Sequence, residues 1–65
     1  MNALNDNRDF FWTEKSAKEG DVSAQFNLAT MYDDGVGVAH DRGQAVYWYS
    51  KAIEQGHTGA QDRMS

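Results

Sequence analysis

The chain has 65 residues with no Cys and no Pro, and ten Asp and Glu against six Lys and Arg give it a net charge of −4. This length allows one small domain, and the composition excludes both a disulfide framework and a zinc site built on Cys ligands. An acidic chain is a poor direct ligand for nucleic acid or an anionic membrane, and no apolar stretch approaches the ~18 residues of a membrane span. The first residues show no signal-peptide pattern, so we expect a cytoplasmic location.

The apolar residues favour helices over strands. Of 26 apolar residues, eight are Ala, eight are Phe, Trp or Tyr, and only seven are Leu, Ile or Val. Aromatic side chains set against Ala suit helices that approach closely, whereas strands favour β-branched runs. The composition therefore predicts an all-α fold.

Three helices and a short fourth are predicted in chain order, over about 6–19, 22–34 and 43–55 and from near Thr58. A glycine that can adopt φ > 0 follows each of the first three: Gly20, Gly35 and Gly56. The expected N-caps are Asn5, Asp21 and Asp41, the last in a capping box with Gln44. The only long connection is 35–41. The turns at 20–21 and 56–57 are tight, so neighbouring helices should run antiparallel.

Two helices carry an apolar stripe at helical spacing, which predicts their buried faces. In the second predicted helix the stripe is Ala24, Leu28, Met31, Tyr32 and Gly35. In the third it is Ala45, Trp48, Tyr49, Ala52 and Ile53. The Ala residues let the helix axes approach, and Tyr32 and Trp48 are expected to fill the space between them.

The sequence also repeats itself with a shift of 36 residues. Residues 12–20 then fall on residues 48–56, with Trp12 on Trp48 and Gly20 on Gly56. A period in the thirties with two helices per unit is typical of a helical solenoid. The shift predicts that Trp12 occupies the same inward position as Trp48.

The stretch from Ala24 to Gly56 resembles the Sel1-like repeat family, which belongs to the tetratricopeptide-type helical repeats. The matching positions are Ala24, Leu28, Tyr32, Gly35, Gly37, Val38, Asp41, Ala45, Trp48, Lys51, Ala52 and Gly56. The chain departs from the family pattern at Ala29, Met31 and Ala39, where Gly, Leu and Pro are usual. The resemblance implies a short stack of antiparallel helical hairpins that contacts proteins and carries no intrinsic catalysis.

No motif in the chain predicts chemistry, so we expect no enzyme activity, no cofactor and no metal. His40 and His57 lie in different turns and should not share a metal ion. The Gly35–Val–Gly37 sequence lacks the remaining glycine of a dinucleotide fingerprint and does not follow a strand. No Cys nucleophile or serine nucleophile elbow is present.

The sequence 10–12, Phe-Phe-Trp, has two interpretations. By the repeat shift, Asp9 takes the place of Ala45 and Thr13 that of Tyr49, so the first helix has lost part of its buried pattern. Phe10 and Phe11 either close the open end of a short stack or form an exposed aromatic contact for a partner or a second copy. A homodimer is therefore a further possibility.

Antiparallel packing gathers charge at one end of the stack. The residues expected there are Asp6, Arg8, Asp9, Asp33, Asp34, Asp41 and Arg42, with a net charge of −3. Asp6 and Asp41 suit helix N-termini, whereas Asp33 and Asp34 lie in the last turn of a helix, where the helix dipole disfavours acids. These two residues are either simply solvated or retained for binding.

We therefore predict a single helical-repeat domain over residues 1–65, with one full repeat over about 22–56 and half repeats on either side. Its predicted function is non-enzymatic binding of a protein through a rigid acidic surface formed by Asp6, Asp9, Asp33, Asp34 and Asp41. The alternative is a small acidic inhibitor that mimics DNA, as some phage anti-CRISPR proteins do, and blocks a basic nucleic-acid-binding surface.

Overall fold

The computed structural model describes residues 3–64, and their side chains from residue 9 onward. Four helices follow one another: α1 (Ala3–Lys18), α2 (Val22–Asp34), α3 (Arg42–Glu54) and α4 (Thr58–Met64). No strand occurs in this part of the chain, so the all-α prediction is confirmed. The principal-axis extents are 35 × 22 × 16 Å. Within residues 3–64, no helix is long and apolar enough to cross a bilayer.

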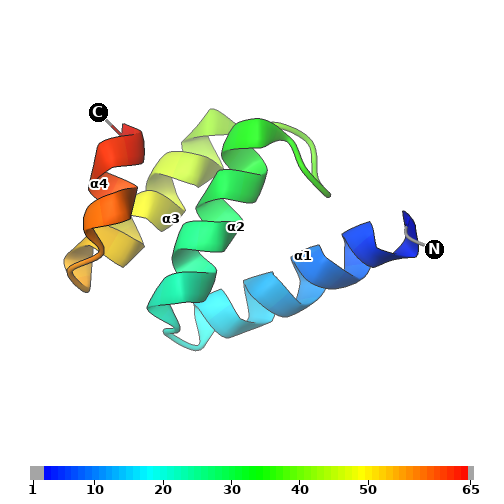
Figure 1. Cartoon of the computed structure of the whole chain (residues 1–65), viewed down its shortest axis with the longest axis horizontal. Helices are drawn as coiled ribbons and strands as arrows, with labels where there is room; N and C mark the ends of the chain where they lie inside the picture. Colours follow the sequence, from blue (N-terminus) through cyan, green and yellow to red (C-terminus); the bar gives the residue numbers. More distant parts are fainter. Residues whose placement is uncertain (1–2, 65) are drawn as a thin grey trace.

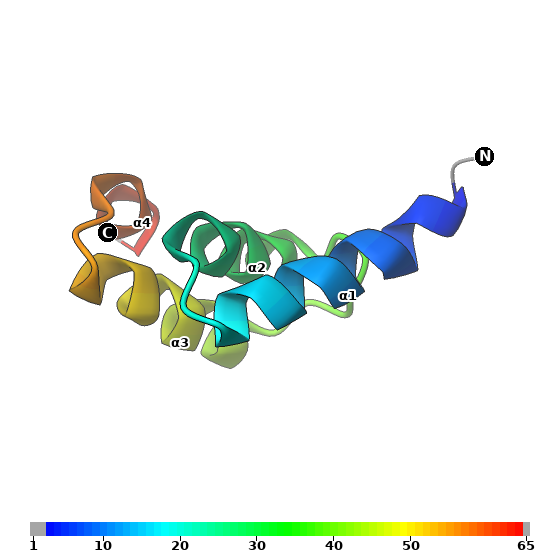
Figure 2. The same ribbon diagram turned by 90° about the horizontal axis from the view of Figure 1, so that it is seen from below.

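The helices form two layers, with α1 and α3 in one and α2 and α4 in the other (Figures 1 and 2). Each helix packs mainly on its neighbours in the chain, and the α2–α3 contact is the most extensive. This zigzag arrangement is the stack of antiparallel hairpins that the repeat period predicts. The stack therefore has one edge at α1 and the other at α4.

The turns follow the sequence signals closely. Gly20, Gly35 and Gly56 all have positive φ, at 101°, 71° and 89°. The Asp21 carboxylate accepts a hydrogen bond from the Ala24 N–H at 3.0 Å and caps α2. These are the conformations that glycine and an N-cap carboxylate supply at low cost.

Two capping predictions were wrong in part. Helix α1 already begins at Ala3, so Asn5 lies inside the helix and is not its N-cap. Asp41 does cap α3, through its carboxylate and the Gln44 N–H at 3.1 Å. Its own N–H, however, donates to the Tyr32 carbonyl at 3.0 Å rather than to the Gln44 side chain. The bond across the 35–41 loop thus replaces the second half of the capping box.

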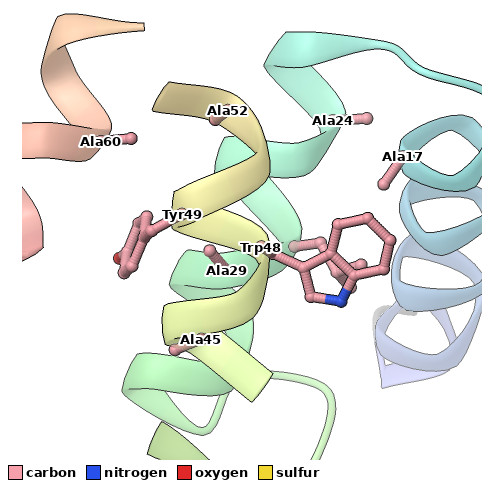
Figure 3. Close-up of a cluster of buried hydrophobic side chains, with 9 residues drawn as sticks. Ala17, Ala24, Ala29, Ala45, Trp48, Tyr49, Ala52 and Ala60 are labelled. Atoms are coloured by element: carbon pink, nitrogen blue, oxygen red, sulfur yellow. The ribbon is translucent and has the colours of Figure 1, made fainter. Parts of the chain in front are cut away.

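The core is built from small residues around a few large ones. Its buried members are Ala17, Ala24, Leu28, Ala29, Ala45, Trp48, Tyr49, Ala52 and Ala60. Leu28 and Tyr49 are the largest fully buried side chains, whereas Tyr32 is only half-buried. Tyr32 packs against this core as predicted but is only half-buried, and Tyr49 is the aromatic ring that lies fully inside it. In Figure 3, the Trp48 indole points from α3 toward α1, and the Tyr49 ring points the opposite way, toward α4.

The buried Gln25 joins three segments of the chain. Its amide nitrogen donates to the Ala17 carbonyl at 3.1 Å, and its oxygen accepts from the Gln55 side chain at 3.0 Å. Gln55 also donates to the Gly20 carbonyl at 3.0 Å. A buried amide satisfied in this way fixes the α1–α2 turn against the end of α3.

Candidate interaction surfaces

The predicted acidic end contains a cluster of ion pairs around Asp33, which lies near the end of α2. Arg42, the first residue of α3, donates to the Asp33 carboxylate at 2.8 Å. Arg63 of α4 lies 3.5 Å from Asp33 and 3.3 Å from Asp34, and the Tyr49 hydroxyl donates to Asp33 at 3.4 Å. Asp33 therefore ties α2 to both α3 and α4.

This cluster gives Asp33 a structural role that the sequence did not reveal. Hydrogen bonding from the Arg42 guanidinium is the main cause that lowers the pKa of the Asp33 carboxyl. Burial partly opposes the shift, and the charges of Arg42 and Arg63 add to it. An acid in the last turn of a helix is disfavoured by the helix dipole, and two arginines offset that cost here.

The other acids predicted at this end are more open. Asp34 is exposed apart from its contact with Arg63, and Asp41 is exposed while it caps α3. Asp9 is exposed on α1 and lines the same hollow as Met31 and Val36, at the end of α2. The Asp6 side chain lies outside the described residues. The structure thus brings Asp33 and Asp34 together beside Arg63, whereas Asp9 lies in the hollow between α1 and α2.

The aromatic residues of α1 do not follow the repeat-based prediction. Trp12, expected to point inward like Trp48, is 57 % exposed, whereas Trp48 is 8 % exposed. Phe10 is the half-buried residue instead, edge-on to Tyr32 with ring centroids 5.7 Å apart. Phe11 is exposed and packs edge-on against Trp12 at 5.4 Å. The prediction failed because α1 covers Trp48, and among the described residues no helix lies on the outer side of α1.

His57 caps a helix and packs against an aromatic ring. Its ring stacks on Phe26, with centroids 4.5 Å apart, and its Nδ1 accepts the Ala60 N–H at 3.0 Å. This hydrogen bond caps the start of α4, as a Ser or Asp side chain would elsewhere. Within the described residues, no group of three or more His, Asp or Glu is placed to hold a metal ion.

Comparison with known sequences decides the family. The pattern of the Sel1 repeat matches residues 10–21 and again residues 22–57, which together make up most of the chain. The chain belongs to the Sel1 repeat family. The fold agrees, because a Sel1 repeat protein from Oxalobacter formigenes superposes with a TM-score of 0.83 at 38 % identity, over 85 % of this chain and 16 % of that one.

The curated Sel1-repeat relatives bear regulatory names. The chitin synthase regulator SKT5 of Malassezia restricta is 28 % identical over 92 % of this chain. A chitin synthase regulatory factor of Schizosaccharomyces pombe is 38 % identical over 82 % of it, and the rat DAP3-binding cell death enhancer 1 is 36 % identical over 85 %. The chain spans only 4 %, 6 % and 10 % of these proteins respectively. The matches therefore cover only a small part of each of these proteins.

Proposed function

We propose that this Sel1-repeat chain is a non-enzymatic protein-binding module, with residues 1–65 acting as one unit. The observation that carries the proposal is the family itself, whose curated relatives here are named as regulators or as a binder. Several described polar side chains support it, because Asp21, Asp41 and His57 cap helices and Arg42 joins α3 to α2. A rigid stack with this kind of surface is suited to recognition.

We infer that the acidic end takes part in that binding. Asp34 and Asp41 lie exposed there, and Asp9 is exposed in the hollow between α1 and α2. A partner with a basic surface would be steered toward this end and held more weakly at high salt. Asp33 is a poor choice for the contact because its oxygens are engaged by Arg42, Arg63 and Tyr49.

The acidic-end proposal is tested with a charge reversal. Asp34→Lys should weaken capture of a partner from a host lysate and remove its salt dependence, while Glu54→Lys at the opposite end of α3 should leave capture unchanged. Both variants should keep the helical circular dichroism spectrum, because both residues are exposed. Equal capture by the wild type and Asp34→Lys at every salt concentration would contradict the acidic contact.

The alternative of a DNA-mimicking inhibitor draws on the same exposed acids. Arg42 and Arg63 pair with Asp33 and Asp34, which reduces the negative charge that such a mimic would present. Competition separates the two functions: if double-stranded DNA displaces the captured partner, the inhibitor is favoured. If DNA has no effect, the module binds a surface that nucleic acid does not use.

A further inference from the structure

A groove runs between α1 and α2 along the open edge of the stack. It consists of two adjoining hollows of about 340 and 280 Å³, which share Thr13 and Asn27. We call it the edge groove; its main lining residues are Asp9, Trp12, Thr13 and Ser16 of α1 and Ser23 and Asn27 of α2. We propose that the edge groove binds one amphipathic helix of a protein partner that carries a basic side chain opposite Asp9.

The internal repeat identifies the kind of segment that fits this groove. Under the 36-residue shift, the lining residues Asp9, Thr13, Ser16, Ser23 and Asn27 fall on Ala45, Tyr49, Ala52, Gly59 and Arg63. The first three of these counterparts are fully buried on α3, whose most extensive contact is with α2. The other two are on α4: a Cβ added at Gly59 would lie 3.9 Å from the Phe26 ring of α2, and Arg63 reaches Asp33.

The surface of α3 and α4 that corresponds to the edge groove is therefore already occupied by α2. One repeat earlier, the hollows between α1 and α2 lie at the corresponding place. Among the described residues, no further helix precedes α1 to fill them (Figures 1 and 2). A helix in the orientation of α2 is thus the shape that the edge groove accepts.

The chemistry of the edge groove differs from that of its filled counterpart. Ala45, Tyr49 and Ala52 are replaced by Asp9, Thr13 and Ser16, so the floor is polar and carries a carboxylate. Asp9 is exposed and forms no ion pair with any residue in the range 9–64. Covering an unpaired carboxylate is costly, so an incoming helix must bring a cation. Trp12, with Met31 and Val36 at the far end, supplies apolar contact area.

The contacts of α2 show where that cation belongs. Asp33 of α2 contacts Arg42 and Tyr49, which lie about one helical turn on either side of Ala45. A docked helix in the same orientation would place its residue equivalent to Asp33 over Asp9. An acid there would be repelled and an arginine would pair, so the edge groove selects a basic helix.

The proposal rests on the protein-binding function and can be tested with a helix of known fit. The probe is a capped synthetic peptide with the sequence of residues 21–35 and the substitution Asp33→Arg, and the control peptide keeps Asp33. Each is titrated into the folded protein while the indole N–H signals of Trp12 and Trp48 are followed by NMR. We expect the arginine peptide to shift the Trp12 signal saturably, with the control peptide at least about tenfold weaker.

Variants of the protein locate the site. Peptide affinity is compared among the variants by isothermal titration calorimetry, because Trp12→Ala lacks the reporting indole. Trp12→Ala should abolish binding of the arginine peptide, and Asp9→Asn should weaken it about tenfold. Tyr47→Ala is the matched control, since Tyr47 is 51 % exposed, is also aromatic and does not line the edge groove. If the arginine peptide leaves Trp12 unmoved, or Tyr47→Ala loses as much binding as Trp12→Ala, the proposal fails.

Three further outcomes separate this proposal from others. If the Trp12 signal moves with the protein's own concentration and sedimentation shows a larger species, a second copy fills the edge groove and the partner-helix proposal is wrong. If Asp34→Lys abolishes capture of a partner while Trp12→Ala has no effect on it, the edge groove fails and the acidic-end proposal survives. If neither variant changes capture, both surfaces are excluded.

Discussion

Helices α1 and α3 are two copies of one sequence element in different surroundings. Phe11 and Trp12 on α1 correspond to Tyr47 and Trp48 on α3, and each pair packs edge-on, with centroids 5.4 and 4.9 Å apart. Yet Trp12 is 57 % exposed and Trp48 8 %. The local geometry is shared, so the difference comes from the neighbouring helices. In a repeat protein, the burial of a residue is set by the adjacent repeats as well as by its own sequence.

Exchanging the residues that differ between α1 and α3 tests this comparison with the largest expected effect. Ala45→Asp would bury an unpaired carboxylate at a position that is fully buried, which should cost about 3–5 kcal/mol and unfold the domain. The reverse change, Asp9→Ala on exposed helix α1, should stabilise slightly, by at most about 0.5 kcal/mol, because Ala is the better helix former. Urea denaturation followed by circular dichroism measures both. A folded Ala45→Asp variant would contradict the stacking of α3 on α2.

The paired tryptophans give a similar contrast. Trp48→Ala should cost about 3–5 kcal/mol, since it removes a large buried side chain next to Ala17 and Leu28. Trp12→Ala should change the free energy of unfolding by less than about 0.5 kcal/mol, as is usual for an exposed position. Thermal and urea unfolding check both variants. Equal losses would mean that Trp12 is buried after all.

The N-cap of α3 has a smaller expected effect. Asp41→Ala removes the carboxylate that accepts the Gln44 N–H and should cost about 1 kcal/mol. Asp41→Asn keeps an acceptor and should recover most of that loss. If Asp41→Ala has the stability of the wild type, this cap does not stabilise α3.

Acidification probes the ion pairs that join α3 to α2. The pKa of Asp33 is lower in the folded protein than in the unfolded chain, chiefly because Arg42 donates a hydrogen bond to it. The resulting stabilisation is present above the unfolded pKa, near 4, and is lost as the pH falls through the folded pKa. Asp33→Asn should therefore be less stable than the wild type at neutral pH, and the difference should shrink in acid. A constant difference from neutral pH to about pH 2 would show that the Asp33 charge does not contribute.

Most of the fold could be predicted from the sequence because the residues at the helix ends signal the boundaries clearly. Positive-φ glycines and aspartate caps mark the helix ends, and Ala spacing marks the buried faces. The start of α1 was less predictable, because Asn5 resembles a cap but lies inside a helix that begins at Ala3. The role of Gln25 was missed, although its recurrence beside Ala at Gln61 was a signal that the residue belongs to the repeat.

The candidate surfaces were harder to predict than the fold. The sequence identified Asp33 and Asp34 as unusual acids, but only packing shows that Arg42 and Arg63 converge on them from two other helices. The 36-residue shift also indicated that Asp9 and Thr13 take the places of Ala45 and Tyr49. The sequence alone did not show that Asp9 and Thr13 line an open groove, because the groove depends on how α2 packs on α1.

Fluorescence quenching by acrylamide tests the central claim most directly, namely that α1 is an open edge and α3 a filled interior. The variants Trp12→Phe and Trp48→Phe each leave one tryptophan to be observed. We predict strong quenching and red-shifted emission from Trp12, with weak quenching and blue-shifted emission from Trp48. Equal quenching of the two tryptophans in folded protein would contradict the account.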